Sequence, residues 1–360
     1  MLKQIKRVRD RLFGAGETEA SVPVLDGPLK PNHLLENAEV FFEAADLEDM
    51  CITADGRLMV ASGATVYSVD ESGKEQTIAS LDEPIQALTA YADGLVAATS
   101  GTLHFIGGHF DGKKFQLATA PFVGCINAMC EHPDGSIMVS EGSARHVHAE
   151  WARDLLSDGA SGRILQYLPE IDKLNIIQQD LKYAFGVLVD MHGAIYTSES
   201  WRHRIVQLST GNARSVYQDL PGYPSRLIKA GAGGYWLTVF APRNQLVEFV
   251  LRETGFKNEM MATVESRYWI APALSSGHDF IEPMQQGGVR QMGVLKPWAP
   301  ARSYGLVVRL DADFQPQYSL HSRVGGYHHG VTAVAEFQGA LLVLSKGANK
   351  VLRLPLSEIN

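Results

Sequence analysis

The amino-acid sequence predicts an all-β fold, and within that class a six-bladed β-propeller. The main observation is a recurring unit: a turn containing glycine, an apolar strand, a short polar break and a second strand. The marker glycines of these units are Gly56, Gly94, Gly135, Gly193, Gly234 and Gly339. Their intervals are 38, 41, 58, 41 and 105 residues. Three of the five intervals are close to the ~40–50 residues of a propeller blade. Glycine is also frequent, with 34 in 360 residues, which favours a fold with many tight turns.

Each unit supplies the alternating apolar segments that paired strands need. The units begin at Asp55, Asp93, Asp134, His192, Gly233 and Gln338. Glycine in the turn suits a hairpin that requires positive φ, and β-branched and aromatic residues suit the strands. The unit at Gly233 reads GGYWLTVFAPRNQLVEFV, so QLVEFV is expected to be its second strand. A two-sheet sandwich would place turns every 8–12 residues or so, whereas these blade-length units favour radial closure of the sheets.

Three segments lie outside the repeat. Residues 143–160 carry apolar side chains at helical spacing, and residues 257–303 form a long insertion with a proline-rich end. Insertions this long inside a compact domain are functional lids, interfaces or surface decoration, and the 257–303 insertion is a candidate homodimer contact. Residues 1–20 combine an apolar stripe with basic residues, which predicts a peripheral helix that packs on the domain or lies on a membrane surface. The excess length therefore predicts one domain over 1–360 with insertions.

Composition excludes several classes of protein. The net charge of -8 disfavours a nucleic-acid-binding protein, which needs a basic surface. No apolar run is long enough to span a membrane, and the N-terminus lacks the apolar core of a secretory signal. Cys51, Cys125 and Cys130 are an odd number without metal-ligand spacing, which indicates free thiols in a reducing compartment. A cytoplasmic protein that acts on a small molecule is expected.

From Gly162 onward the sequence resembles the strictosidine synthase-like family. The resemblance rests on GRILQYLP (162–169), LKYAFGVLVDMHGAIYTSES (181–200), RIVQL (204–208) and above all LPGYPSRL (220–227) followed by GGYWL. The closing SKGANKVLRLP adds to it. The family and its gluconolactonase, regucalcin and paraoxonase relatives have six-bladed propellers with a site at the central channel. The resemblance therefore implies the same fold as the repeat, and it implies lactone or ester hydrolysis, or a condensation reaction, without choosing between them.

In the hydrolytic relatives the site holds Ca²⁺ through a glutamate, two asparagines and an aspartate. The resemblance implies that Glu48 and Asn127 occupy two of these positions. At the other two, this chain has Phe185 where the relatives have asparagine, and YPSR in place of YPDN, which gives Ser225 and Arg226. Phenylalanine cannot ligate a metal, and an arginine repels a divalent cation. With two of four ligand positions replaced, we expect an altered metal site, or Glu48 and Asn127 as ordinary polar residues of the channel.

Strictosidine synthase itself uses a catalytic glutamate in its last blade. Counting back from Gly339, the matching position in this chain is Thr332, which has no carboxylate, and Glu336 lies too close to the turn. Condensation by that mechanism is therefore not expected here.

Several ionisable residues fall where strands of a propeller reach the channel mouth. We predict acid–base roles for His328 and His329 in GGYHHGV, for Glu199, and for Glu141, which is followed by His146 and His148. A carboxylate beside a histidine can activate water when burial adjusts their pKa values. Convergent histidines could also bind Zn²⁺ or Fe²⁺, although no compact metal motif is present. The alternative for each histidine is a structural role.

A second group of residues is predicted to bind the substrate. The guanidinium of Arg226 could hold a carboxylate or phosphate in place of the metal, or form a salt bridge with Glu48 or Glu199. The other predicted substrate-binding residues are Phe185, Trp201, His203, Ser225 and His278. Together they predict a small-molecule hydrolase of the lactonase or esterase type. A non-hydrolytic lyase or condensing enzyme using Glu/His chemistry and a catalytically decayed binding propeller are the alternatives.

Overall fold

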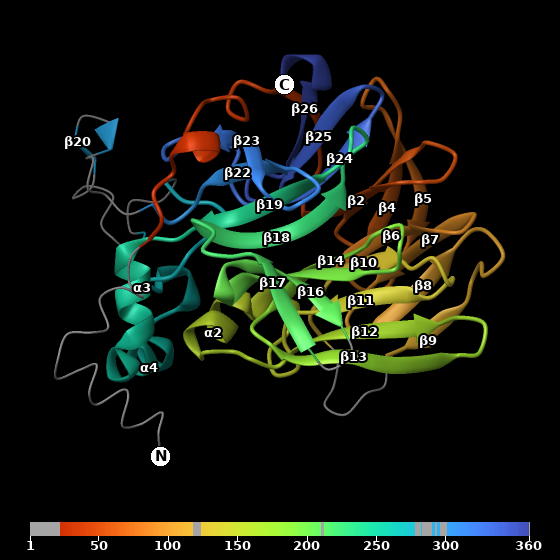
Figure 1. The fold of residues 1–360 in the computed structure, drawn as a ribbon, viewed down its shortest axis with the longest axis horizontal. Coiled ribbons are helices and arrows are strands. Elements are labelled where there is room, and N and C mark those ends of the chain that lie inside the picture. Colours follow the sequence, from red (N-terminus) through yellow and green to blue (C-terminus); the bar gives the residue numbers. More distant parts are fainter. Residues whose placement is uncertain are drawn as a thin grey trace.

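The computed structural model describes residues 22–117, 124–209, 212–277, 282, 290–291, 294–295 and 301–359. The helix predicted within residues 1–20 and His278 lie outside the described residues. Six four-stranded antiparallel sheets form a ring, as the repeat predicted (Figure 1). Their innermost strands contact one another in the cyclic order β2, β6, β10, β14, β18, β24 and back to β2. The ring closure removes long exposed sheet edges around the channel.

The first three blades run consecutively along the chain. The first blade contains β2 (Leu47–Ile52), β3 (Leu58–Ser62), β4 (Thr65–Val69) and β5 (Glu75–Ser80). The second contains β6 (Ala87–Tyr91), β7 (Gly94–Ala98), β8 (Thr102–Ile106) and β9 (Lys114–Gln116). The third contains β10 (Ile126–Glu131), β11 (Ile137–Glu141), β12 (Gly162–Leu168) and β13 (Lys173–Leu181). In each of them the predicted unit supplies the second and third strands.

The remaining blades include the main insertion and the ring closure. The fourth contains β14 (Ala184–Val189), β15 (Ile195–Glu199), β16 (Arg204–Ser209) and β17 (Asn212–Tyr217). The fifth contains β18 (Gly222–Lys229), β19 (Tyr235–Pro242), β22 (Gly305–Leu310) and β23 (Pro316–Ser322). The sixth contains β24 (Val331–Phe337), β25 (Ala340–Ser345), β26 (Lys350–Pro355) and, as its outer strand, β1 (Glu39–Glu43). The strand nearest the N-terminus thus completes the last blade.

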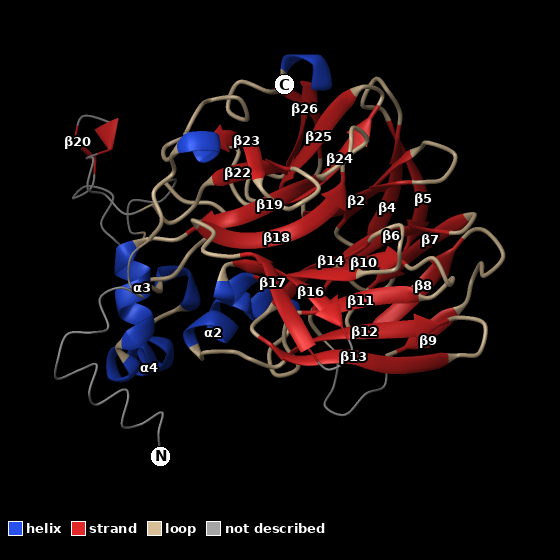
Figure 2. Cartoon of the chain, in the orientation of Figure 1, coloured by secondary structure: helices blue, strands red, loops and turns tan. Residues whose placement is uncertain are grey.

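Helices gather on one side of the strand-rich body (Figure 2). They are α2 (Trp151–Leu156), α3 (Gln245–Arg252) and α4 (Thr254–Thr263). Short 3-10 turns are η2 (Gly27–Leu29), η3 (His148–Glu150), η4 (Ser200–Arg202), η5 (Ser266–Tyr268) and η6 (Leu356–Glu358). A two-stranded pair, β20 (Arg290–Gln291) and β21 (Val294–Leu295), also lies in the long insertion. The structure describes no helix long and apolar enough to cross a membrane.

One predicted strand is wrong. QLVEFV, expected as the second strand of the fifth unit, is the helix α3 (Gln245–Arg252). The side chain of Asn244 caps this helix by accepting a hydrogen bond from the backbone N–H of Val247 at 2.8 Å. Val247 and Val250 are buried at helical spacing. The third strand of this blade is instead β22, so the inserted segment begins before residue 257.

Five marker glycines have the positive φ that their turns require, and Gly94 does not. In the second unit the left-handed position is Ala92, with φ 46°. Gly94 is needed for space instead, because a Cβ there would lie 2.5 Å from the carbonyl oxygen of Gly107. The turn was therefore located correctly, but its glycine serves strand packing.

The core is divided into six wedges, one between each pair of neighbouring blades. Between the second and third blades, for example, Phe105 packs with Ile126 and Tyr167. Similar clusters fill the other five blade interfaces. A seventh cluster joins Tyr183, Phe185 and Phe240 and lies against the insertion helices. Burial between blades thus fixes the inner strands, and they in turn position the polar residues of the channel.

Candidate functional site

Five of the six inner strands are bulged near their first residues, and the predicted metal-site positions lie at these bulges. Register shifts occur between Leu47 and Asp49, Ile126 and Ala128, Ala184 and Val187, Pro224 and Leu227, and Val331 and Ala333. The residues inside these shifts include Glu48, Asn127, Phe185, Ser225, Arg226 and Thr332. A bulge releases residues from the regular strand pairing and re-aims their side chains. Five separate bulges therefore present chemistry-bearing side chains at one end of the channel.

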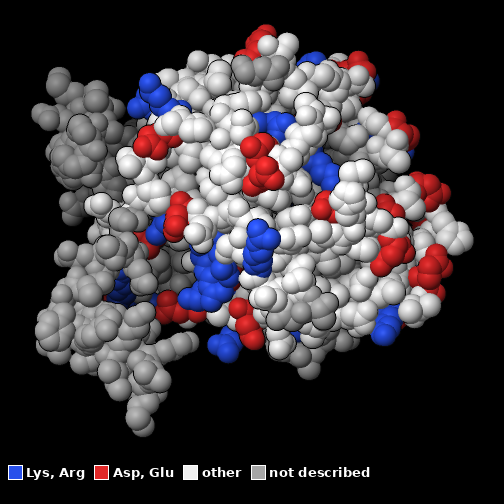
Figure 3. Space-filling view, viewed as in Figure 1, with Lys and Arg blue, Asp and Glu red and all other residues white. Residues whose placement is uncertain are grey.

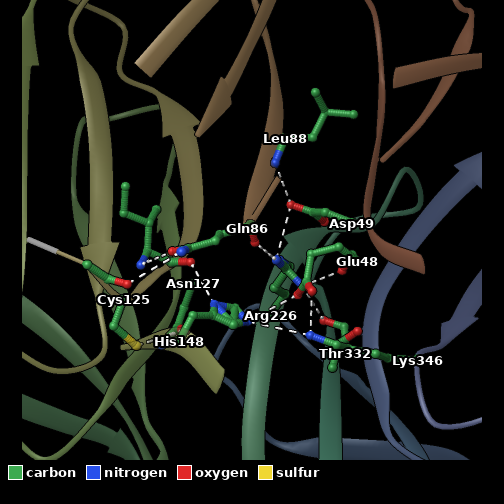
Figure 4. A network of polar contacts seen from close by, with 12 residues as sticks. Glu48, Asp49, Gln86, Leu88, Cys125, Asn127, His148, Arg226, Thr332 and Lys346 are labelled. Atoms are coloured by element: carbon green, nitrogen blue, oxygen red, sulfur yellow. Dashed lines mark hydrogen bonds and ion pairs between the residues drawn. The ribbon is translucent and has the colours of Figure 1, made fainter. Parts of the chain in front are cut away.

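Arg226 lies at the centre of this end of the channel (Figure 4). Its Nη1 contacts the carbonyl oxygens of Glu48 and Thr332, both at 3.4 Å, and its Nη2 contacts that of Gln86 at 3.3 Å. Nη2 also lies 3.2 Å from Oδ2 of Asp49. Oxygen atoms from the first, second and sixth blades thus converge on a guanidinium from the fifth. The ion pair predicted for Arg226 exists, but its carboxylate is that of Asp49.

Asp49 pairs with the arginine and joins two blades. Its Oδ2 accepts a hydrogen bond from the backbone N–H of Leu88 at 2.8 Å, and Oδ1 accepts one from Met50 at 2.9 Å. Burial raises the pKa of Asp49 to about 6, although Arg226 and these two donors act in the opposite direction. Asp49 and Arg226 also line a channel cavity of ≈ 330 Å³ whose walls come from all six inner strands.

Glu48 forms a second charged group beside the arginine. Its Oε2 is paired with Nζ of Lys346, and its Oε1 lies 3.3 Å from Nε2 of His148. Burial alone would raise the pKa of the Glu48 carboxyl, but the positive charges around it, first that of Lys346, hold the pKa below its ordinary value. Glu48 is therefore a carboxylate at neutral pH.

His148 begins η3 in the insertion after β11 and closes the polar network. Its Nδ1 lies 3.3 Å from the carbonyl oxygen of Ile126, and its Nε2 lies 3.5 Å from Nζ of Lys346. A carbonyl only accepts hydrogen bonds, so in the neutral ring the proton is assigned to Nδ1 and Nε2 accepts from Nζ of Lys346. Burial lowers the pKa of His148 to about 4. The charge of Glu48 acts to raise this pKa, and the charges of Lys346 and Arg226 act to lower it further. The imidazole is neutral at pH 7.

Asn127 is fully buried and has a structural role beside this network. Its amide nitrogen donates to the carbonyl oxygen of Ala184 at 2.8 Å. Its Oδ1 lies 3.8 Å from Sγ of Cys125, whose pKa burial raises to about 12. The three cysteines are free thiols, and this one is protonated at neutral pH. Asn127 therefore links the third and fourth blades.

Phe185 and Trp201 form part of an aromatic wall. The ring of Phe185 lies 5.6 Å from the Arg226 guanidinium carbon, and Trp201 stacks on Tyr183 with 4.3 Å between the ring centroids. The indole nitrogen of Trp201 donates to Oδ1 of Asp154 in α2 at 2.7 Å. This wall connects the channel end to the helical insertion. Ser225, by contrast, is fully buried and donates to Thr238 at 2.8 Å and to the carbonyl oxygen of Val331 at 3.1 Å.

The structure gives His328 and His329 structural partners. Nδ1 of His328 lies 2.8 Å from the carbonyl oxygen of Leu35. His329 lies between the Ser303 hydroxyl, at 2.7 Å, and the carbonyl oxygen of Arg323, at 2.9 Å. Both imidazoles are buried. The open turn expected at GYHHG is filled by these contacts, so the acid–base role assigned to the two residues has no support in the geometry.

The other predicted acid–base residues are also engaged within their own blades. Glu199 accepts from the backbone of Lys182 at 2.7 Å and pairs with Arg202 and Arg204. Glu141 pairs with Arg163. Burial raises the pKa of Glu141 to about 7, although Arg163 acts to lower it. Neither carboxylate belongs to the network around Arg226 in Figure 4.

His203 ends η4 in a left-handed conformation, with φ 51°. Its Nδ1 lies 3.1 Å from the carbonyl oxygen of Gly222, and its Nε2 lies 3.7 Å from Oε1 of Glu248. Burial, and then the charge of Arg243, lower its pKa to about 3. His203 is thus a neutral structural residue in the described fold.

The donor set does not fit the calcium ion that the family resemblance implied. Glu48 is already neutralised by Lys346, and the amide nitrogen of Asn127 is turned to a carbonyl oxygen. Phe185 offers no oxygen, and the Arg226 guanidinium lies among the carbonyl oxygens that could otherwise face a cation. Calcium requires six to eight oxygen ligands. Across the described residues, no group of three or more His, Cys, Asp or Glu side chains is placed to hold a metal ion.

Sequence reasoning missed Lys346, Asp49 and Gln86 as members of the site. Lys346 follows β25 and is 298 positions from its partner Glu48, so only ring closure brings them together. Asp49 directly follows Glu48 in β2, and neighbouring residues of a regular strand point to opposite faces of the sheet. The bulge that brings both side chains to the site is not visible in the sequence. One signal could have identified Lys346. It is an ionisable residue in SKGANK, a segment that carried the family resemblance.

Comparisons with known proteins agree with this fold. No family model matches the chain. The adipocyte plasma membrane-associated protein of Salmo salar is 21% identical, with 94% of this chain and 82% of the relative aligned. Strictosidine synthase-like protein 6 of Arabidopsis thaliana is 25% identical over 48% of each chain. The chain thus spans most of the first relative and about half of the second.

Solved propellers superpose on most of the chain. A gluconolactonase from Xanthomonas campestris has a TM-score of 0.56 at 13% identity, covering 88% of each chain. A regucalcin from Agrobacterium tumefaciens has a TM-score of 0.55 at 12% identity, covering 88% of this chain and 92% of that one. Likeness at such identity establishes the fold, which is shared with a lactonase-type hydrolase. By sequence, the chain is a relative of the strictosidine synthase-like proteins, as its motifs predicted, and also of the adipocyte plasma membrane-associated proteins.

Proposed function

We propose that the protein is a small-molecule hydrolase of the lactonase or esterase type in which fixed cationic side chains replace a divalent metal. The observation that carries the proposal is the neutral imidazole of His148, placed between Glu48 and Lys346 at the channel end. Its Nε2 can accept a proton from water, and two positive groups lie beside it. Shared fold with a gluconolactonase supports hydrolysis of this kind.

His148 acts as the general base in this proposal. Nε2 takes a proton from a water molecule while the water oxygen attacks the carbonyl carbon of a lactone or ester. The negative charge that develops on the carbonyl oxygen favours the imidazolium form beside it, which raises the basicity of the ring during the reaction. The C–O bond of the tetrahedral intermediate then breaks, and the imidazolium returns the proton to the leaving oxygen. The products are a carboxylic acid and an alcohol, joined in one molecule when the substrate is a lactone.

Arg226, Lys346 and Thr332 supply the positive and hydrogen-bonding groups for the developing oxyanion. Among the described residues, Nε of Arg226 and Oγ1 of Thr332 are buried donors without a hydrogen-bond partner. The two residues adjoin each other, because Nη1 of Arg226 contacts the Thr332 carbonyl oxygen at 3.4 Å. Preorganised donors of this kind stabilise charge that appears only in the transition state. Glu48 holds Lys346 in place through their ion pair.

The test is hydrolysis of γ-lactones and aryl acetates by the wild-type protein and two histidine variants. His148→Gln is expected to lower kcat at least about 100-fold, since general-base catalysis contributes that much. His146→Gln is the matched control: His146 belongs to the same insertion but lies 3.7 Å from Glu150 and takes no part in the network. Equal activity of His148→Gln and wild type would overturn the assignment. If the wild type binds the lactones saturably but does not hydrolyse them, the protein is a binding propeller and not a hydrolase.

The same proposal includes three expectations that come from the sequence. The substrate is a small molecule, the protein is cytoplasmic, and the long insertion remains a candidate homodimer contact. On the face drawn in Figure 3, basic and acidic side chains are interspersed, in keeping with a small-molecule substrate.

A further inference from the structure

A second cavity, of ≈ 500 Å³, lies between the two insertions. One side is formed by residues 149–153 at the start of α2, and the other by residues 266–269 and 272–275. Arg302 and Glu282 complete the described lining. None of its described lining residues belongs to the proposed acid–base group.

The cavity adjoins the proposed site through two chain neighbours. Ala149 lines the cavity and directly follows His148. Leu274 lines it from the other side, and its carbonyl oxygen packs on Gly347, where a Cβ would lie 2.0 Å away. Gly347 directly follows Lys346. The walls of the cavity are therefore continuous with the segments that carry the base and one cation of the site.

Eight of the fifteen described lining residues are aromatic or apolar. Trp151, Tyr268 and Trp269 line it together with Pro272 and Leu274. Trp151 packs against Phe240 of the aromatic wall, with ring centroids 5.4 Å apart. Trp269 is buried, and its indole nitrogen donates to the carbonyl oxygen of Val264 at 2.9 Å. These rings are held in place by the fold, which is the property of a preformed ligand pocket.

The charged groups of the cavity are engaged with the protein. Arg302 is buried; its Nε donates to the carbonyl oxygen of Ala271 at 3.2 Å, and its Nη2 contacts that of Trp269 at 3.4 Å. Its Nη1 lies 3.9 Å from Glu282. The guanidinium of Arg153 lies over the Trp269 ring at 4.9 Å. Glu150 and Arg267 also line the cavity; Glu150 lies 3.6 Å from Arg153, and Arg267 is paired with Glu265 at 2.9 Å. Because each of these charges has a partner of opposite sign within the protein, the wall offers a ligand its aromatic and apolar surface.

We propose that this cavity binds the apolar acyl or aryl arm of the substrate while the lactone or ester carbonyl lies at His148. The inference rests on the proposed hydrolase function and names its substrate class. The volume of the cavity, ≈ 500 Å³, falls in the range that holds a drug-sized molecule. A simple sugar lactone would fill only part of it. The preferred substrates are therefore lactones or esters with a long alkyl, acyl or aromatic substituent.

The experiment measures kcat/KM over a series of γ-lactones from γ-butyrolactone to γ-dodecalactone. Each methylene that enters an apolar pocket is expected to raise kcat/KM about fourfold, as its transfer from water predicts. Tyr268→Ala is expected to flatten this dependence, so that the ratio of kcat/KM for γ-dodecalactone to kcat/KM for γ-butyrolactone falls. Tyr268 is chosen because it is only partly buried. Phe249→Ala, which removes an exposed aromatic ring on α3 outside the cavity, is the control.

A binding measurement separates this inference from the proposed function. Titration of γ-decalactone into the His148→Gln variant, followed by tryptophan fluorescence, does not depend on turnover. Binding that weakens on adding Tyr268→Ala supports the pocket even if no lactone is hydrolysed, in which case only the proposed function fails. Rates independent of tail length, or binding unaffected by Tyr268→Ala, would overturn the pocket while leaving hydrolysis at His148 intact.

Discussion

At the scale of single residues, the main feature is a cation supplied by the chain itself. Arg226 draws the carbonyl oxygens of Glu48, Gln86 and Thr332 together and pairs with Asp49. A guanidinium offers five fixed donors and does not lose its charge near neutral pH. It therefore stabilises the converging inner strands, and its Nε is a buried donor without a hydrogen-bond partner among the described residues.

Removing this arginine is expected to destabilise the fold strongly. Arg226→Met leaves Asp49 buried without its counter-charge, which costs about 3 kcal/mol or more in the free energy of unfolding. The double variant Arg226→Met/Asp49→Asn removes both charges and is expected to recover much of the loss. Urea unfolding of the two single variants and the double variant measures the coupling. A single variant as stable as the wild type would show that the pair does not hold the blades.

His203 gives a pH-dependent prediction with a defined sign. Its pKa falls from the ordinary 6.5 to about 3 on burial, so the unfolded chain binds more protons between these pH values. The stability that depends on a neutral His203 is complete above pH 6.5 and declines as the pH falls toward 3. Asparagine does not titrate and tolerates the left-handed backbone.

Lowering the pH from 7 to 5 is therefore expected to reduce the free energy of unfolding less in His203→Asn than in the wild type. The difference between the two reductions is about 2 kcal/mol. Unfolding by urea at both pH values measures this difference, and comparing the loss within each protein cancels the other titrating groups. An unchanged pH dependence would show that His203 is already protonated or solvated in the folded protein.

At the scale of elements, repeat and motif reasoning located the blades but only part of the site. The turns at Gly56 and Gly339 were visible because local glycine chemistry produces them. Helix α3 was missed because Gln245–Arg252 has an apolar content that suits either element, and its cap and neighbours decide the outcome. Glu48 and Arg226 were predicted from aligned motifs, whereas Lys346 joins them only through ring closure.

The packing of Leu274 on Gly347 links the long insertion to the sixth blade. Gly347→Ala would place a Cβ 2.0 Å from the Leu274 carbonyl oxygen, so backbone must shift, and a cost of about 1–3 kcal/mol is expected. Gly255→Ala is the control, because this α4 position has open space and alanine favours a helix by about 0.5–1 kcal/mol. Thermal unfolding that ranks the two variants in the opposite order would contradict this packing.

At the scale of the whole molecule, stability depends on closing the ring. β1 completes the sixth blade by pairing with β26, and Phe42 of β1 is buried in the wedge between the sixth and first blades. The strand thus connects the start of the described chain to its end. Because the channel residues come from every blade, an open ring would also disperse the site.

Phe42→Ala is expected to cost about 3–5 kcal/mol, since it leaves a cavity in this wedge. Val40→Ala on the same strand is the control, because Val40 is 37% exposed and should change stability by less than about 1 kcal/mol. Equal effects in urea unfolding would mean that β1 does not seal the ring in solution.

The central claim is that fixed cations, with His148 as base, replace the family's metal. Hydrolysis of γ-decalactone in metal-free buffer, with and without EDTA and then with added Ca²⁺, tests it most directly. We predict that the wild-type rate is unchanged by EDTA and by Ca²⁺, and that His148→Gln remains inactive in all three conditions. A rate abolished by EDTA and restored by Ca²⁺ would contradict the account.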